Sequence, residues 1–308
     1  MGIILKKVGQ KKMSSSSVLE PYLKGNQSNV TNYDWYMLEH GYQYLSQGYM
    51  HKIFVKDKKI YKIVKPEFFS TYNTYDHFAK EMYNHNYLER RGFPAVRVNH
   101  IYNIGEIVPD FYVLEENYIE GSVYTQSTIP QEFVYKIINL LIAISDIEID
   151  HFGLNQDKVQ FTCWREHINY LLDCAKEIAE KYQVYSDFEL LRRYFTEEYE
   201  YKLAPKFLIF DPNEENFIFD DEQKILAIID VDHATGGDPL WQMGCIYYHR
   251  PHYKEIIFSF LNNEEKETVI QYALLHGLND IAFRMSSNSA DTSGLKNFAH
   301  FTLHLSKE

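Results

Sequence analysis

The sequence predicts an α+β protein, with a small lobe built on an antiparallel sheet and a larger, mostly helical lobe. In the first third of the chain, the apolar runs 52–55 and 60–64 flank a polar turn, which is typical of a β-hairpin. Further along, long segments carry apolar residues at helical spacing. We therefore expect a flexible tail over residues 1–20, an N-terminal lobe over 21–118 and a C-terminal lobe over 119–308.

The remaining elements follow the same two periodicities. A helix is predicted over 75–91, because Phe78, Met82 and Leu88 lie near helical spacing and Gly92 ends the segment. Further strands are expected at 96–102, 111–116, 207–210 and 225–229, and further helices at 133–147, 162–182 and from residue 240 onward.

Composition limits the classes of partner. The chain has 308 residues, and its 43 acidic against 31 basic side chains give a net charge of −12, which argues against a general nucleic-acid binder. No stretch approaches the roughly 18 apolar residues of a membrane span. Three scattered cysteines are too few for a disulfide framework or a zinc site. We expect a cytoplasmic protein, monomeric or weakly dimeric, with neither a nucleic acid nor a membrane as its partner.

Three side chains with oxygen ligands form the most informative pattern. Asp211 and Asn216 lie five residues apart after the apolar run 207–210, and Asp230 ends the apolar run 225–229. A carboxylate that takes a proton from a hydroxyl, together with oxygen ligands that hold Mg²⁺, suits phosphoryl transfer from a nucleotide. Asp-Pro-Asn is also a common turn and Asp230 could cap the next segment, so each piece alone favours a structural interpretation.

Three further residues occur in the order that this chemistry needs. Gly48 precedes the first strand of the predicted hairpin, where a turn could cover phosphates. Lys62 lies in the middle of the second strand, and Glu81 lies on the next helix, placed to pair with it. Each of these residue types is common by itself. It is uncommon for all three to occur in this order before the three residues with oxygen ligands.

At these positions the sequence resembles the aminoglycoside phosphotransferase family, small-molecule kinases that share the bilobal protein-kinase-like fold. The family's catalytic segment reads His-x-Asp-x-x-x-x-Asn, followed later by Ile-Asp. Residues 209–216 and 229–230 match this pattern, except that Ile209 replaces the histidine. Gly-Asp-Pro at 237–239 also matches the family, and the resemblance extends from about Gly48 to Arg250.

Two short segments are similar to the hygromycin-phosphorylating members of the family. These are Phe-Thr-Cys-Trp-Arg-Glu at 161–166 and Ile-Tyr-Tyr-His-Arg-Pro at 246–251. In other places the sequence departs from the family. Gln242 replaces an acid that follows Gly-Asp-Pro, and the nucleotide loop has one glycine where the family has two. These departures, with Ile209, leave open a nucleotide-binding protein without turnover.

The resemblance implies a role for each residue of the pattern. Asp211 would be the catalytic base, and Asn216 and Asp230 would hold Mg²⁺, with Asp232 an alternative to Asp230. Lys62 would contact the α- and β-phosphates. The other residues implied in nucleotide binding are Gly48, His51, Glu81, Asn117 and Ile119.

Two of these roles concern how the nucleotide is held. Glu81 would orient Lys62, and Gly48 with His51 would form the turn above the phosphates. Asn117 and Ile119 belong to the hinge, whose backbone would offer a carbonyl and an N–H group to the edge of a purine.

Candidate contacts to the acceptor surround the aromatic helix that follows the metal loop, and they are Asp232, Tyr247, Tyr248 and Arg250. Aromatic residues on a helix more often belong to the core than to a binding surface, so both interpretations of the two tyrosines stay open.

The expected function is that of an ATP- and Mg²⁺-dependent phosphotransferase acting on a hydroxyl of a small cationic molecule. An aminoglycoside antibiotic of the hygromycin type is the favoured acceptor, which would make the protein a resistance enzyme. GTP in place of ATP stays open. The alternatives are a metabolic kinase of the same architecture, acting on choline, homoserine or a sugar, and a nucleotide-binding pseudoenzyme.

Overall fold

A computed structural model describes residues 31–48, 50–68, 73–105, 111–125, 128–154, 161–182, 185–199, 204–209, 212–287 and 293–305. These residues fall into two compact units. The first runs up to Tyr124 and also contains Phe217–Asp232, and the second comprises Thr125–Asn216 and His233–Glu308. The chain therefore returns to the first unit, where the sequence suggested a single boundary after residue 118. The expected tail over 1–20 lies outside the described residues.

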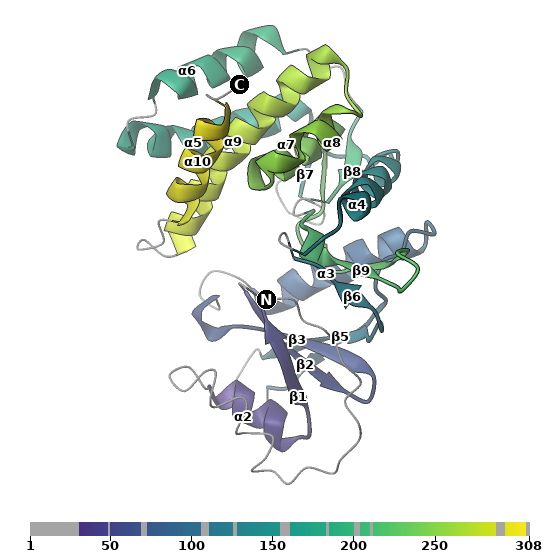
Figure 1. Ribbon diagram of the computed structural model, residues 1–308. Helices are drawn as coiled ribbons and strands as arrows, with labels where there is room; N and C mark the ends of the chain where they lie inside the picture. The colour runs from purple at the N-terminus through teal and green to yellow at the C-terminus, as the bar shows by residue number, and fades with distance from the viewer. Residues whose placement is uncertain are drawn as a thin grey trace. The chain divides into compact units, whose positions relative to one another are not determined.

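The first unit is built on an antiparallel sheet (Figure 1). Its described strands have the order β1-β2-β3-β5-β4. The strands are β1 (Gln43–Gln47), β2 (His51–Lys56), β3 (Lys59–Val64), β4 (Val98–Asn103) and β5 (Tyr112–Asn117). The predicted hairpin is confirmed as β2 and β3. Its two turn residues, Asp57 and Lys58, have φ values of 49° and 58°, which suit the twist of a two-residue hairpin.

Both faces of this sheet are buried, because its side chains alternate between two helices. Ile63 and Val113 pack with Met37 of α2 (Asn32–Glu39). Val64 packs on the other side with Phe78 of α3 (Thr74–Glu89). The short 3-10 helix η1 (Pro66–Phe68) lies between β3 and α3 in the sequence. The Asn73 side chain caps α3 by accepting hydrogen bonds from the N–H groups of the first turn.

A second sheet returns residues 217–232 to the first unit. It has the order β10-β9-β6, from β6 (Ser122–Val123), β9 (Phe217–Phe219) and β10 (Ile225–Ile228). A Cβ atom on Gly121 would lie 2.5 Å from Ile218 Cγ2 and 2.6 Å from the Phe219 carbonyl, so only glycine fits where β6 meets β9. Ile228 also bridges Ala95, which attaches β10 to the segment after α3.

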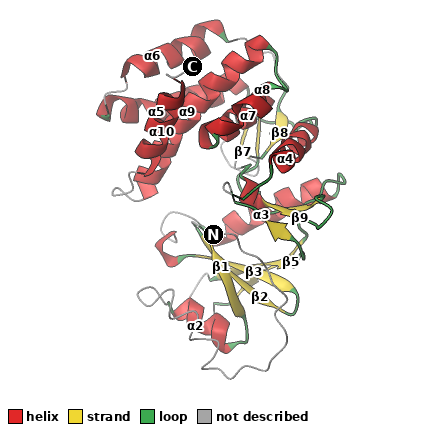
Figure 2. Cartoon of the chain, viewed as in Figure 1, coloured by secondary structure: helices red, strands yellow, loops and turns green. Residues whose placement is uncertain are grey.

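The second unit is mostly helical (Figure 2). Its α-helices are α4 (Gln131–Ile144), α5 (Trp164–Lys181), α6 (Tyr185–Arg193), α7 (Pro239–His249), α8 (Lys254–Phe258), α9 (Asn263–Ser287) and α10 (Ser293–Leu305). A small sheet has the order β7-β11-β8, from β7 (Gly153–Leu154), β8 (Lys206–Leu208) and β11 (Thr235–Gly237). Short turns of helix are η2 (Tyr194–Glu198), η3 (Glu214–Asn216) and η4 (Pro251–Tyr253).

The predicted α+β class is confirmed, with the antiparallel sheet in the first unit and most helices in the second. The helices and strands expected from periodicity are present close to their predicted bounds. Short elements without a clear period were not predicted, among them α2, β1, β6, β7, β9 and β11. No described helix has the length and apolar character to cross a membrane.

Candidate active site

Lys62 is a buried cation at the centre of the first unit. It lies on the face of β3 that α3 covers, and only 5% of it is exposed. Its ammonium contacts the Glu81 carboxylate of α3 and lies 3.0 Å from Glu116 Oε1 on β5. Burial disfavours this charge, but Glu116, Glu81 and Asp230 outweigh burial and hold the pKa of Lys62 well above its usual range. The predicted pairing of Lys62 with Glu81 is therefore present.

The pKa values of the two glutamates shift in opposite directions. Burial raises the pKa of Glu81, but the adjacent Lys62 ammonium outweighs burial and holds that pKa well below its ordinary value. For Glu116, burial prevails over Lys62 and raises the pKa. Glu81 is thus the lasting anion beside Lys62, whereas Glu116 takes up a proton more readily. Glu116 was not predicted as a site residue, although it lies two residues from Leu114 on β5 and therefore on the same face of the sheet.

Asp230 follows β10 in a backbone conformation that L-residues rarely adopt, with φ 64°. Its negative charge helps to hold the pKa of Lys62 above its usual range, and it opposes the burial that lowers the pKa of His51. Asn84 of α3 fixes the segment that follows, because its Nδ2 donates to the carbonyl of Val231 at 2.8 Å. The first unit therefore brings Lys62, Glu81, His51 and Asp230 into one electrostatic cluster.

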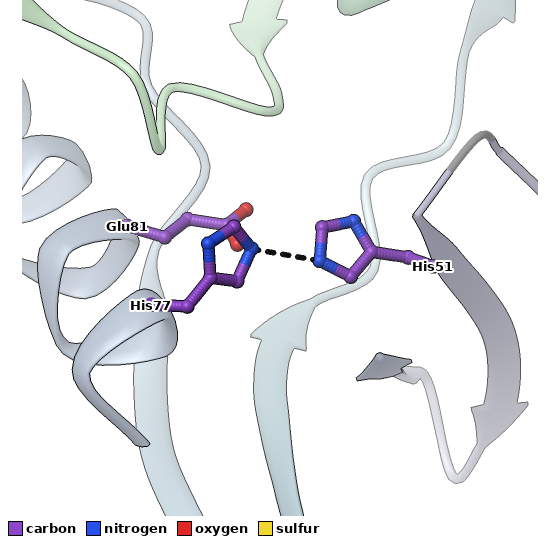
Figure 3. Close-up of side chains that lie close together, drawn as sticks. All are labelled: His51, His77 and Glu81. Carbon is purple, nitrogen blue, oxygen red and sulfur yellow. Dashed lines mark hydrogen bonds between the residues drawn. The ribbon is translucent and has the colours of Figure 1, made fainter. Parts of the chain in front are cut away.

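His51 and His77 form a buried pair within this cluster (Figure 3). Their Nε2 atoms are 2.9 Å apart, so one donates a hydrogen bond to the other. Asp232 Oδ2 lies 3.4 Å from His77 Nε2, which places Asp232 against α3. His77 was not predicted, but its spacing of four residues from Glu81 puts both on one face of α3.

The turn between β1 and β2 is closed by a hydrogen bond of 2.9 Å from Gly48 N–H to the His51 carbonyl. Gly48 is exposed, and a Cβ added to it would meet no atom within 4 Å. None of the described residues therefore crowds this position in a way that requires glycine. The tip residue Tyr49 lies outside the described residues.

The hinge follows β5. The backbone N–H of Asn117 donates to Arg97 O at 2.9 Å, and that of Tyr118 donates to Lys58 O at 3.2 Å. The Asn117 side chain also accepts a hydrogen bond from Lys59 Nζ at 2.6 Å. The backbone N–H groups of Asn117 and Tyr118 therefore already have acceptors within the protein.

In the second unit, the predicted base Asp211 lies outside the described residues. Asn216 ends η3, and its N–H donates to Asn213 O at 3.0 Å. Arg250, at the end of α7, donates from Nε to both carboxylate oxygens of Glu214, at 2.9 and 3.0 Å. Arg250 thus anchors the loop that carries Asn216, a positioning contact that the sequence did not reveal.

A small apolar hollow of about 20 Å³ lies beside this contact, between α4, α7 and the residues that precede and begin η3. Its lining includes Ile137, Pro212, Ile246, Arg250 and Tyr253. Its volume is that of about one water molecule, so it does not accommodate a sugar ring.

Tyr247 and Tyr248 are 0% and 3% exposed, and both pack against Phe301 of α10. Core packing accounts for these tyrosines, and their burial lends no support to an acceptor role.

Two sequence motifs meet in the second unit. A Cβ on Gly237 would lie 2.6 Å from the ring of Trp164, so Gly-Asp-Pro begins with glycine where the indole packs. Trp164 Nε1–H donates to Tyr272 at 2.6 Å, and the Tyr272 hydroxyl donates to Asp238 at 2.7 Å. Asp238 also caps α7 through Leu240 N–H, and Pro239 occupies the first helical position.

These features define the class of fold. No protein-family model matches the sequence, and no curated protein matches it. Among solved structures, the chain is similar to aminoglycoside phosphotransferase APH(4)-Ia in ternary complex with ADP and hygromycin B. Identity is 17%, coverage is 89% of this chain and 96% of that chain, and the TM-score is 0.66.

Two further structures show the same likeness. The GDP complex of an aminoglycoside 2'-phosphotransferase-IIIa mutant has 12% identity, covers 94% and 98% of the two chains and gives a TM-score of 0.62. Choline kinase LicA from Streptococcus pneumoniae has 15% identity. The match covers 95% of this chain and 99% of that chain, with a TM-score of 0.60. The chain thus has the protein-kinase-like fold of small-molecule phosphotransferases, and the predicted resemblance is confirmed at the level of fold.

Proposed function

We propose that this protein is a nucleotide-dependent phosphotransferase that transfers a phosphoryl group to a hydroxyl of a small cationic molecule. The observation that carries this proposal is the Lys62–Glu81 pair beside Asp230, within a fold shared with proteins solved as ADP, AMP-PNP and GDP complexes. A buried ammonium fixed by one carboxylate is suited to bind phosphate oxygens.

The donor set fits Mg²⁺. Asp230 and Asn216 offer a carboxylate and an amide oxygen, which are hard ligands of the kind Mg²⁺ prefers. Asp230 is only partly buried, which is compatible with this role. We assign these two residues to Mg²⁺, which when bound would neutralise the phosphates.

The chain's own residues divide the remaining work. Glu81 and Glu116 hold the Lys62 ammonium in place, so that its position does not depend on the ligand. The Ile119 N–H would orient the base of ATP, and Asp211 would accept the proton of the acceptor hydroxyl. Positioning and electrostatic stabilisation supply most of the rate in such reactions, because the phosphoryl group needs little covalent assistance.

The favoured acceptor is an aminoglycoside of the hygromycin type. It is supported by the similarity to APH(4)-Ia and by the local motifs at 161–166 and 246–251. A choline-type acceptor is the second candidate, because the fold is also shared with choline kinase LicA. Both acceptors are cationic, which suits a chain with a net charge of −12.

The test is a panel of acceptors assayed for ADP release with MgATP. We expect turnover with an aminoglycoside and loss of at least about a hundredfold in kcat for Asp211→Asn, the scale of a general base. Activity on choline but on no aminoglycoside would replace the first acceptor with the second. ATP binding without turnover on any acceptor would indicate a pseudoenzyme and contradict the proposal.

A further inference from the structure

Three potential metal ligands converge in the first unit, on the sheet face covered by α3 (Figure 3). They are His51 at the start of β2, and His77 and Glu81 one turn apart on α3. One ligand atom from each lies within 4.8 Å of the other two, and all three residues are buried. Two imidazoles and a carboxylate form a donor set that suits borderline transition metals, whereas Mg²⁺ prefers oxygen ligands alone.

The two imidazoles are already at a distance that one ion can bridge. Their Nε2 atoms are 2.9 Å apart. With metal–nitrogen bonds of about 2.0–2.1 Å, both nitrogens can bind one ion at an angle of about 90°. A cation would replace the proton that the two rings share.

Glu81 provides a second, independent indication of a cation. The residue is fully buried, and its Oε1 contacts Lys62. Its Oε2 is buried and has no hydrogen-bond partner among the described residues. An unsatisfied oxygen of a buried carboxylate is costly unless a ligand completes it. Glu81 can therefore bind a metal through Oε2 and keep Lys62 on Oε1.

The surrounding charges favour a divalent ion. Lys62 opposes a metal, but its charge is shared by Glu81 and Glu116. Asp230 acts electrostatically on His51, and Asp232 Oδ2 lies 3.4 Å from His77 Nε2. Anionic side chains thus outnumber cations in this cluster, and Asp232 is well placed to become a fourth ligand.

A neighbouring cluster of Glu81, His85 and Glu116 meets the same distance criterion. Here the Oε1 atoms of both glutamates already contact the Lys62 ammonium, which therefore takes the place of a metal. In the His51–His77–Glu81 cluster, Lys62 does not compete for Glu81 Oε2, so this cluster is the better candidate for a metal site.

We propose that His51, His77 and Glu81 form a binding site for a borderline divalent transition-metal ion of the Zn²⁺ class, distinct from the Mg²⁺ site assigned to Asn216 and Asp230. The ion would join the start of β2 to α3. This site does not depend on phosphoryl transfer, because its ligands and its test involve neither nucleotide nor acceptor.

The test is titration of the metal-free, nucleotide-free full chain with Zn²⁺ by calorimetry, and with Co²⁺ by visible absorption. We expect one ion per chain, unaffected by excess Mg²⁺. His51→Gln and His77→Gln should each weaken binding by more than about tenfold, the least that loss of even a supporting residue costs a metal site. His85→Gln and the exposed His100→Gln are the matched controls and should leave affinity unchanged.

Thermal unfolding of each metal-free variant checks that it remains folded. If either His51→Gln or His77→Gln unfolds, the other supplies the measurement, because each removes one ligand. Loss of binding in His85→Gln but not in His51→Gln would assign the metal to the neighbouring cluster and overturn the proposal. Absence of Zn²⁺ binding to the folded wild-type chain would also overturn it, whatever the outcome of the phosphotransferase assay.

Discussion

The side-chain amide oxygen of Gln242 accepts a hydrogen bond of 2.8 Å from the backbone N–H of Ile209. The two positions at which the sequence departs most visibly from the aminoglycoside phosphotransferase pattern are therefore in contact. Gln242 is 0% and Ile209 1% exposed. Ile209 packs in the core, and Gln242 retains the acceptor function that a carboxylate would provide. The backbone before Asp211 therefore remains anchored despite these departures.

Replacing Gln242 tests this anchor. Gln242→Ala should lower the free energy of unfolding by about 1–3 kcal/mol, because the buried Ile209 N–H loses its acceptor. Gln242→Glu keeps an acceptor oxygen, so we expect more of the wild-type kcat to survive in it than in Gln242→Ala. Chemical denaturation and the ADP-release assay measure the two effects. Equal stability of wild type and Gln242→Ala would show that the hydrogen bond does not anchor the loop.

Removing the buried cation should be costly even without a nucleotide. Lys62→Met leaves Glu81 and Glu116 without their counter-charge, so we expect a loss of about 3–5 kcal/mol in unfolding free energy. Adding Glu116→Gln should recover part of this loss, because one buried carboxylate is removed. Lys59→Met on the same strand is the control. The Lys59 side chain is 33% exposed and lies 3.7 Å from Glu115 Oε1, so this pair should matter by less than about 1 kcal/mol. A similar loss in both lysine variants would contradict the burial argument.

Gly237 should not tolerate a side chain. In Gly237→Ala, the new Cβ would lie 2.6 Å from the buried Trp164 ring, and we expect a loss of about 1–3 kcal/mol from overpacking. Gly48→Ala is the matched control, because a Cβ there meets no atom within 4 Å. Gly48→Ala should leave the melting temperature unchanged. If the turn covers the phosphates, this variant should bind ATP more weakly. A stable Gly237→Ala protein would mean that Trp164 can move.

Acid should weaken the second unit through its buried histidines. Burial lowers the pKa of His167 to about 4 from 6.5, so the folded state favours the neutral ring. A depressed pKa contributes stability above pH 6.5, and this stability is lost as the pH falls toward 4. The loss reaches up to about 3 kcal/mol for this group.

His167→Phe removes the titration and keeps an aromatic ring against Phe161 and Trp164. The melting temperatures of the wild type and the variant are measured between pH 7 and pH 4. The melting temperature of the variant should rise relative to that of the wild type as the pH falls. Parallel curves for the two proteins would show that His167 does not carry the pH dependence.

The sequence predicted Lys62 and Glu81 because strand alternation and helix position follow from local rules. Glu116, His77 and Asn84 act through long-range contacts, and such contacts depend on which strands pair and which helix face is buried. Tyr247 and Tyr248 show the reverse difficulty. Their position after the metal loop suggested a pocket, but α10 covers them, and no local pattern indicates that a later helix will do so. Asp211 and Tyr49 remain sequence predictions.

The return of residues 217–232 to the first unit has a consequence for how the protein is made. The unit that carries Lys62 is not a continuous stretch of chain. As the chain leaves the ribosome, β6 and Asn84 must wait for their partners in β9 and at Val231 until the segments forming α4, α5 and α6 have been synthesised. A chain that stopped after Tyr124 would lack Asp230 and leave the edge of β6 unpaired. Completion of the cluster of Lys62, Glu81, His51 and Asp230 is therefore a late event in biosynthesis, and partial chains would lack it.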